Sequence, residues 1–336
     1  MKHANVSIFV PHNGCPHSCS FCNQVRITGQ QSQPTAEDVI QAVETAMKSR
    51  NYHPKKSEIA FFGGSFTAIR KEYMILLLES AYPYVHNGSF SGIRISTRPD
   101  CINDEVLVLL KSYGVKSIEL GTQSMSNDVL QANRRGHTAE DVEKAALQIK
   151  SYGFELGMQM MTGLYKSTVE KDYDTALKIC QIKPKTVRIY PTIIMKDTLL
   201  ADYYQQGIYR TYTLEETVDL CAELLELFQK SGIDVIRIGL HSTQDIEEGM
   251  LAGAWHPSFG ELCFSRLYRN RIEKYLRENS FEKGNYQIYV YPTEISKVTG
   301  QKKGNRIYFQ ERGYLFRVKA DNGIEQGSFR LEFLGV

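Results

Sequence analysis

The stretch Cys15-Pro16-His17-Ser18-Cys19-Ser20-Phe21-Cys22 decides the fold, and in it three cysteines are spaced CxxxCxxC. It follows Val6 to Val10, a β-branched run that predicts a strand. Three thiolates cannot complete a tetrahedral zinc site or a four-cysteine iron–sulfur site without a further ligand. They can hold three irons of a 4Fe-4S cluster, and the fourth iron is then open to a small molecule that brings its own nitrogen and oxygen.

The amino and carboxylate groups of S-adenosylmethionine (SAM) are ligands of that kind, and one electron from the cluster can then break the sulfonium. We therefore expect Cys15, Cys19 and Cys22 to hold one site-differentiated 4Fe-4S cluster, with SAM as the second cofactor. The alternative is a zinc knuckle, because short cysteine clusters in cytosolic proteins are often zinc sites. His17 lies inside the loop and is either a fourth ligand or a loop histidine that binds no metal.

The cysteine spacing, with the aromatic Phe21 just before the last cysteine, resembles the signature of the radical SAM superfamily. This resemblance implies a partial TIM-like barrel and an enzyme that cleaves SAM reductively to a 5′-deoxyadenosyl radical. It also implies a flavodoxin- or ferredoxin-like electron donor, and it places Phe21 among the cofactor-binding residues.

Short apolar runs alternate with amphipathic helical patterns over most of the chain. Strands are expected at residues 6–10, 58–62, 93–96, 117–120, 154–161 and 186–190, and 234–238 is a candidate final strand. Helices are expected after the capping boxes that begin at Thr35, Thr138 and Thr213, and at residues 71–81, 104–113 and 169–180. Because buried strands that alternate with helices form parallel sheets, the alternation predicts an α/β fold, and the resemblance implies that residues 1–254 form a partial (β/α)6 TIM-like barrel.

Polar and glycine-rich motifs follow the predicted strands, where the chemistry of such barrels lies. The motifs after strands two, three and four are Gly63-Gly64-Ser65, Ser96-Thr97-Arg98-Pro99-Asp100 and Gly121-Thr122-Gln123-Ser124. The double glycine either forms a tight turn or lets an amino-acid moiety approach the backbone. Arg135 either pairs with a carboxylate or is a solvated loop charge.

Six strings resemble the radical SAM domain of the Elongator catalytic subunit family. They are Pro11 to Pro16, Gly63 to Thr67, Thr97 to Asp100, Glu119 to Ser124, Arg135 to Thr138 and Ile189 to Thr192. The resemblance implies that SAM is bound by the cluster, by the Gly63-Gly64-Ser65 segment, and by Gln123 and Arg135, with Arg135 on the carboxylate.

The chain also departs from these families. Ser96 stands where many relatives carry a glutamate, and Gln159 stands where oxygen-independent coproporphyrinogen oxidases carry an aspartate. We expect both side chains near the cofactor, although Ser96 lacks the carboxylate. The 336 residues leave no room for the acetyltransferase domain of the Elongator subunit, so we do not expect its acetyl-CoA-dependent reaction.

The composition is that of a globular protein, with 42% hydrophobic and 23% charged residues. No apolar run approaches the length of a membrane span, and residues 1–10 do not form a signal peptide, so we expect a cytoplasmic protein without a membrane partner. The other four of the seven cysteines are isolated, which indicates neither disulfides nor a second cluster.

Positive charge is concentrated near the carboxyl terminus. Residues 264–319 contain 13 Lys or Arg and 5 Asp or Glu, interleaved with tyrosines. For residues 255–336 we predict a small basic domain with a long helix over 261–278 and an antiparallel sheet from segments 286–291, 306–309 and 314–318. Its charges and rings either contact RNA phosphates and bases, or are solvated charges and sheet core.

These features predict a radical SAM enzyme that acts on RNA, with tRNA as the first choice. A radical reaction on a small molecule, as in coproporphyrinogen oxidase, is the alternative within enzymes. A non-catalytic iron–sulfur protein that binds RNA or acts as a sensor is the alternative outside them, because Ser96 and Gln159 replace carboxylates.

Overall fold

The computed structural model describes residues 4–11, 19–23, 32–240 and 244–335. The strands are β1 (Ala4–Val10), β2 (Ser57–Gly63), β3 (Ile93–Thr97), β4 (Val115–Gln123), β5 (Glu155–Thr162), β6 (Thr186–Pro191), β7 (Ile193–Met195), β8 (Asp234–Ile238), β9 (Met250–Gly253), β10 (Gly284–Val290), β11 (Tyr314–Ala320) and β12 (Phe329–Gly335). The helices are α2 (Ala36–Met47), α3 (Lys71–His86), α4 (Asp104–Ser112), α5 (Asn127–Ala132), α6 (Ala139–Ser151), α7 (Val169–Ile182), α8 (Leu199–Gln205), α9 (Leu214–Lys230), α10 (Gln244–Gly249), α11 (Phe259–Glu278), α12 (Ile295–Thr299) and α13 (Gly304–Gln310), with short 3₁₀ turns between some of them.

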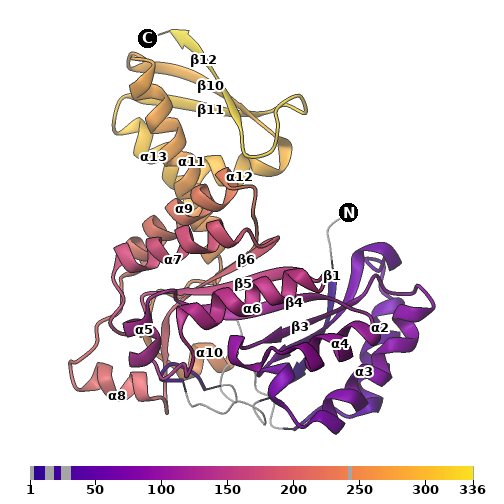
Figure 1. Ribbon diagram of the computed structural model, residues 1–336. Coiled ribbons are helices and arrows are strands. Elements are labelled where there is room, and N and C mark those ends of the chain that lie inside the picture. Colours follow the sequence, from indigo (N-terminus) through magenta and orange to yellow (C-terminus); the bar gives the residue numbers. More distant parts are fainter. Residues whose placement is uncertain (1–3, 12–18, 24–31, 241–243, 336) are drawn as a thin grey trace.

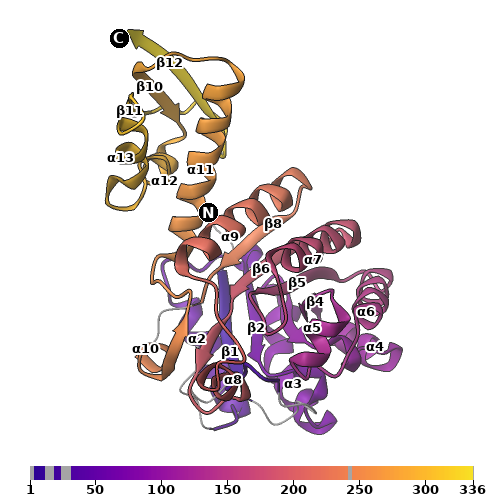
Figure 2. The same cartoon turned by 90° about the vertical axis from the view of Figure 1, so that its left-hand side faces the viewer.

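The main sheet has seven parallel strands in the order β1-β2-β3-β4-β5-β6-β8. It curls into a partial barrel with helices on its outer side (Figure 1 and Figure 2). The predicted α/β barrel is confirmed, and the candidate strand at 234–238 is its seventh strand, β8. The three predicted capping boxes are also present, with Asp38, Asp141 and Glu216 completing them.

Each central strand presents apolar residues to the helices and polar residues to the concave side. In β3, Ile93 and Ile95 join the helix-covered core, whereas Arg94 and Ser96 lie on the opposite face. The same alternation continues in β4, β5 and β6. The concave face, which is the lumen of the barrel, is therefore polar and charged, whereas the packed core lies between the sheet and the outer helices.

The carboxyl-terminal residues form a second, smaller core. Helix α11 contributes to both cores, because Phe259, Cys263 and Leu267 join the first and Tyr268, Ile272 and Leu276 the second. Figure 2 shows α11 rising from α9 to the small sheet. The predicted long helix is confirmed, while the boundary between residues 254 and 255 stays a prediction.

Two details of the predicted appendage are wrong. The sheet is mixed rather than antiparallel, since β10 pairs in parallel with β11 and in antiparallel with β12. Residues 306–309 belong to helix α13, because Phe309 packs into the second core while the Asn305 side chain is tied to backbone carbonyls of α11 and α12. A short apolar run does not distinguish strand from helix.

The six described cysteines are all unbridged, and Cys221 and Cys263 are buried in the first core. In the described part of the chain, no helix has the length and apolar character needed to cross a bilayer.

Candidate functional site

The cysteine loop is described for residues 19–23, and its Ser20 bonds to two later segments. The Ser20 hydroxyl donates to Asn133 Oδ1 at 2.7 Å, and the Ser20 N–H donates to the Asn133 carbonyl at 3.1 Å. The Ser20 carbonyl in turn accepts from the N–H of Leu200, at the start of α8, at 2.8 Å. Asn133 is fully buried and also donates to the carbonyls of Val129 and Tyr165. These bonds position Cys19 and Cys22 at the carboxyl ends of the strands.

The ring of Phe21 packs into a small apolar cluster below the loop. Its partners come from β7, α8, β9 and nearby loops, and they are Ile194, Leu200, Ala201, Tyr209, Tyr165, Tyr203 and Ala252. Phe21 therefore anchors the loop, and its predicted contact with the cofactor stays a prediction.

Arg135 lies beside the cysteine loop. Its Nη1 donates to Cys19 Sγ at 3.0 Å, and its Nη2 donates to the carbonyl of Gly121, near the end of β4, at 2.7 Å. The Arg135 side chain is buried, so it is not the solvated loop charge of the alternative interpretation. A buried guanidinium at this place favours a thiolate and other anions next to it.

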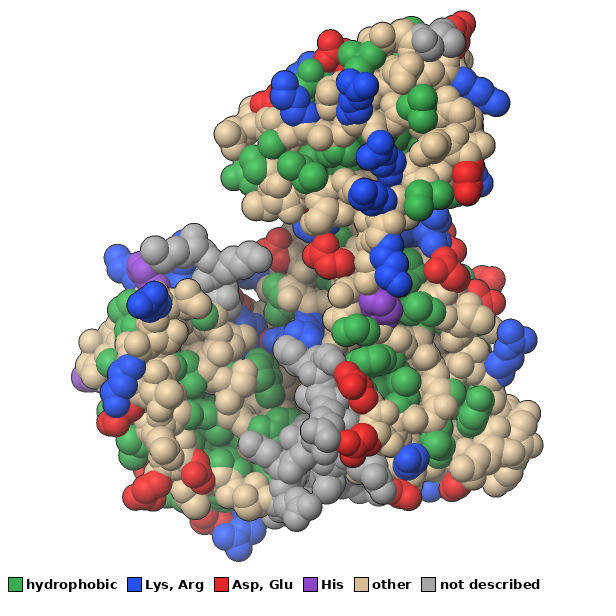
Figure 3. Space-filling model, turned by 180° about the vertical axis from the view of Figure 1, so that it is seen from behind, with side chains coloured by type: hydrophobic (Ala, Val, Ile, Leu, Met, Phe, Trp, Pro, Cys, Tyr) green, Lys and Arg blue, Asp and Glu red, His purple; other side chains and the backbone are tan. Residues whose placement is uncertain are grey.

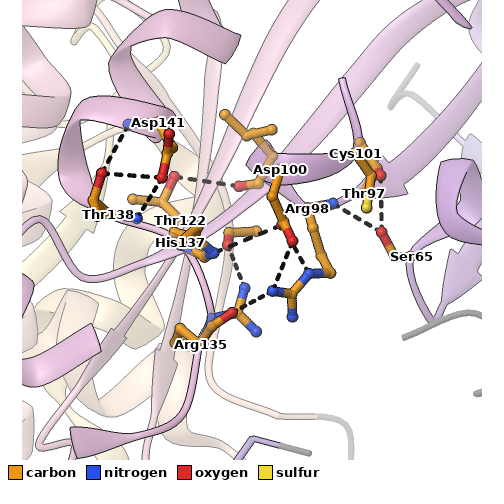
Figure 4. A network of polar contacts seen from close by, with 12 residues as sticks. Ser65, Thr97, Arg98, Asp100, Cys101, Thr122, Arg135, His137, Thr138 and Asp141 are labelled. Carbon is orange, nitrogen blue, oxygen red and sulfur yellow. Dashed lines mark hydrogen bonds and ion pairs between the residues drawn. The ribbon is translucent and has the colours of Figure 1, made fainter. Parts of the chain in front are cut away.

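A network of polar contacts holds Arg135 in place (Figure 4). The buried Arg98 donates to the Arg135 carbonyl and pairs with Asp100, with Nε 2.9 Å from Oδ1. His137 also faces Asp100, at 4.0 Å from Nδ1 to Oδ1. Burial, reinforced by Arg135 and Arg98, lowers the pKa of His137 to about 4, so His137 is neutral near pH 7.

The end of β2 requires glycine at position 63. Gly63 has φ of +114°, and a Cβ there would lie 2.6 Å from the Val10 carbonyl oxygen. The buried Ser65 hydroxyl contacts Thr97 Oγ1 at 2.9 Å and accepts from the Arg98 N–H at 3.0 Å. Ser65 thus ties the end of β2 to the end of β3. The SAM contacts predicted for Gly63, Gly64 and Ser65 stay predictions.

Gly121 leaves a space that two predicted cofactor ligands border. A Cβ on Gly121 would lie 3.3 Å from Gln123 Nε2 and 3.6 Å from Arg135 Nη2. Gln123 has a positive φ of 66°, and its buried Oε1 has no hydrogen-bond partner within the described ranges. The structure thus brings Gln123, Arg135 and Cys19 to one corner, and an unsatisfied buried acceptor there fits a ligand that carries an ammonium group or other donor.

Ser96 and Gln159 meet in the lumen, below this corner. Gln159 Nε2 lies 3.3 Å from Ser96 Oγ and 2.9 Å from Glu119 Oε2. Glu119 is 1% exposed and is held by Arg188, with 2.6 Å between Arg188 Nε and Glu119 Oε2. A carboxylate is therefore present beside Ser96 and Gln159, although it comes from the neighbouring strand β4.

Several residues of this network are not among those predicted from the sequence. On the lumen face, Arg94 pairs with Glu58 at 2.7 Å and approaches Glu119 at 3.5 Å, and Arg188 lies 5.0 Å from the Phe62 ring centre. A signal was available, because Arg94 and Ser96 alternate with apolar residues in a buried strand, as do Ser117 and Glu119. Ser20 and Asn133 carried no such signal.

Cys15 and His17 lie outside the described residues, so the cluster ligand set and the zinc alternative stay open as predictions. Cys19 and Cys22 are described, and the Cys22 N–H donates to the Cys19 carbonyl at 3.1 Å. Within residues 4–11, 19–23, 32–240 and 244–335, no group of three or more His, Cys, Asp or Glu residues has the arrangement of a metal site.

The chain resembles named proteins over most of the barrel. It is 27% identical to Elongator complex protein 3 of Mus musculus over 242 residues, which are 66% of this chain and 43% of that protein. It is 25% identical to tRNA uridine(34) acetyltransferase of Dehalococcoides mccartyi over 246 residues, covering 63% of this chain and 54% of the other. The chain thus spans about half the length of these two relatives.

The fold is also that of a solved relative, the archaeal Elp3 of Methanocaldococcus infernus. The TM-score is 0.60 at 20% identity, covering 84% of this chain and 65% of that one. Residues 9–179 match the family model of the radical SAM superfamily, and residues 184–269 match the model of the Radical_SAM C-terminal domain. With more than half of its length matched by these models, and with the cysteine loop and its arginine placed as described, the chain belongs to the radical SAM superfamily.

Proposed function

We propose that this radical SAM enzyme modifies a nucleoside of tRNA. The observation that carries the tRNA part is the similarity, over about two thirds of the chain, to proteins named for tRNA uridine(34) acetylation. The relatives are longer than the matched region, so the proposal concerns the substrate class and not their acetyl transfer.

The residues at the carboxyl ends of β1 to β4 fit the two cofactors that the family implies. Cys15, Cys19 and Cys22 would hold the cluster, and Arg135, Gln123 and the Gly63-Gly64 turn would hold SAM, with Arg135 next to Cys19. When bound, the cluster and SAM supply a 5′-deoxyadenosyl radical that abstracts hydrogen. The chain's own residues contribute binding and orientation: Arg98 and Asp100 fix Arg135, and Asn133 fixes the cysteine loop.

The C-terminal unit supports RNA as the partner. Lys302, Lys303 and Arg306 are exposed and take part in no ion pair within the described chain, and Figure 3 shows Lys and Arg side chains spread over this unit. The rings, in contrast, are used internally. Tyr268 is buried, with its hydroxyl on Glu294, and Tyr308 lies under the guanidinium groups of Arg269 and Arg312. We therefore assign to this unit attraction of phosphates rather than base stacking.

The decisive experiment compares the modified nucleosides of tRNA from cells with and without this gene. We expect one nucleoside to be missing in the deletion strain and to reappear when anaerobically reconstituted protein, SAM and a reductant are added. A Cys19→Ala variant must fail in that complementation. An unchanged nucleoside profile, together with no affinity of the protein for tRNA, would reject the proposal.

A small molecule with anionic groups is the second candidate substrate. The charge of the lumen favours this candidate. Among the described residues, three arginines there (Arg94, Arg188 and Arg237) are accompanied by two ion-paired acids (Glu58 and Glu119), so positive charge is in excess. Filter binding separates the candidates, because tRNA affinity falls steeply with salt, whereas a small molecule leaves tRNA unbound.

A further inference from the structure

Two arginines lie side by side on neighbouring strands of the lumen. Arg188 of β6 and Arg237 of β8 occupy paired register positions in the parallel sheet. Like charges at neighbouring positions of two strands repel each other. Arg188 is compensated by Glu119, which it contacts through both Nε and Nη2, at 2.6 and 2.8 Å.

Arg237 has no such compensation. Its Nε donates to the Gly239 carbonyl at 3.1 Å, and within the described part of the chain its guanidinium forms no ion pair. Arg237 is half-buried, and burial lowers the pKa of its guanidinium; Tyr190 opposes this effect and the neighbouring Arg188 adds to it. An uncompensated cation in such a place is unfavourable for the empty fold, but it is favourable as soon as an anion binds.

We propose that Arg237, with Arg188 beside it, binds an anionic group of the substrate in the barrel lumen. A phosphate and a carboxylate share the required chemistry, since each accepts two hydrogen bonds from a guanidinium. The choice between the two rests on the proposed function. If that function holds, the anion is a phosphodiester group of the tRNA. For a small-molecule substrate it is a carboxylate.

The strand register gives the position of this anion relative to the corner formed by Gln123, Arg135 and Cys19. Arg237 pairs with Arg188, Arg188 with Gln159, and Gln159 with Gly121, so the four residues form one row across β8, β6, β5 and β4. Neighbouring strands are about 4.8 Å apart, so the row spans about 14 Å along the curved sheet. Gly121 carries the carbonyl that binds Arg135 Nη2, next to Cys19.

A substrate held at Arg237 therefore extends across the lumen toward the corner where Arg135 and Cys19 meet. Gln159 lies between the two ends, and its side chain contacts Ser96 of β3 and Glu119 of β4. The arrangement separates an anchoring end from a reacting end, so Arg237 acts by positioning and is not a catalytic residue.

The test uses anaerobically reconstituted full-length protein and tRNA from cells that lack the gene. Arg237→Gln removes the charge, Arg237→Lys keeps it, and Arg50→Gln removes an exposed arginine in the turn after α2 as the matched control. For Arg237→Gln we expect about a tenfold rise in the Kd for tRNA, and a salt slope smaller by about one ion. Arg237→Lys keeps the charge but loses the paired hydrogen bonds, so its Kd should lie between those of the wild type and Arg237→Gln, whereas Arg50→Gln should match the wild type.

Cleavage of SAM in the absence of substrate provides the second readout. It should be the same in Arg237→Gln and in the wild type, in both KM for SAM and kcat. A raised KM for SAM would overturn the proposal, because the arginine would then bind the SAM carboxylate. An unchanged Kd and salt slope for tRNA in Arg237→Gln would also overturn it, while the proposed function would stand.

A wild type that does not bind tRNA at all would instead refute the proposed function. The anion site is then tested by modifying the arginines with phenylglyoxal in the presence of inorganic phosphate or propionate and measuring the modification of Arg237 by mass spectrometry. Protection of Arg237 by either anion supports the site, and protection by propionate alone identifies a carboxylate. Equal modification with and without both anions overturns it.

Discussion

Glu119 is the acidic centre of the lumen, and its removal should destabilise the protein strongly. Its side chain is 1% exposed and contacts Arg188 at 2.6 Å, Arg94 at 3.5 Å and Gln159 at 2.9 Å. In Glu119→Ala, Arg188 loses its counter-ion while its side chain, only 13% exposed, stays against the Phe62 ring. Removing one partner of a buried ion pair costs about 3–5 kcal/mol, because the remaining charge is left uncompensated. That is a large share of the about 5–15 kcal/mol by which domains are stable.

The measurement is urea unfolding followed by the fluorescence of Trp255, the single tryptophan of the chain. Glu155→Ala on the neighbouring strand is the matched control, since Glu155 and Lys185 are 46% and 59% exposed and such a pair contributes about 0–1 kcal/mol. Adding Arg188→Met to Glu119→Ala should restore part of the loss, because it removes the uncompensated charge. A free energy of unfolding for Glu119→Ala within about 1 kcal/mol of the wild type would refute the ion-pair reasoning.

Three further changes test other parts of the site. Gly63→Ala should destabilise the protein by about 2 kcal/mol or more in the same assay, because φ is +114° and the new methyl group would lie 2.6 Å from the Val10 carbonyl oxygen. A stability equal to that of the wild type would contradict the observed turn. Asn133→Ala should lower the free energy of unfolding by about 2–4 kcal/mol, because buried partners such as Ser20 lose their hydrogen bonds. It should also reduce the iron that the protein retains after reconstitution. Normal iron retention would show that the loop holds its shape without this contact. The free energy of unfolding should fall by about 3 kcal/mol between pH 6.5 and 4, because the unfolded chain takes up a proton at His137 near pH 6.5 and the folded protein only at about 4. His137→Gln should lose this pH dependence. A pH profile identical to that of the wild type would exclude His137 as its source.

The local parts of the fold were predictable, because local signals encode them. Each capping box joins residues three positions apart, so Thr35, Thr138 and Thr213 marked their helices without any tertiary information. The alternation of buried strands and helices implied a parallel sheet, and the position of each motif after a strand implied that the motifs share one end of it. The structure bears this out for Ser65 and Thr97, whose hydroxyl oxygens lie 2.9 Å apart at the ends of β2 and β3.

Contacts between distant strands were not predictable. Glu119 belongs to a motif in the sequence, but nothing near it in sequence shows that its partners are Arg94 and Arg188, 25 and 69 residues away. The pattern of segment 306–309 predicts a strand, because four residues cannot reveal the core against which Phe309 packs as part of α13.

The sequence by itself determined the α/β class, the helix starts and the cysteine spacing, since these depend on residue types at fixed short separations. Only the tertiary structure decided which side chains share the lumen, that Arg135 lies 3.0 Å from Cys19, and that Arg188 and Arg237 are neighbours. Strand register sets these pairings, and register is fixed by the packing of the whole sheet against its helices rather than by any segment alone.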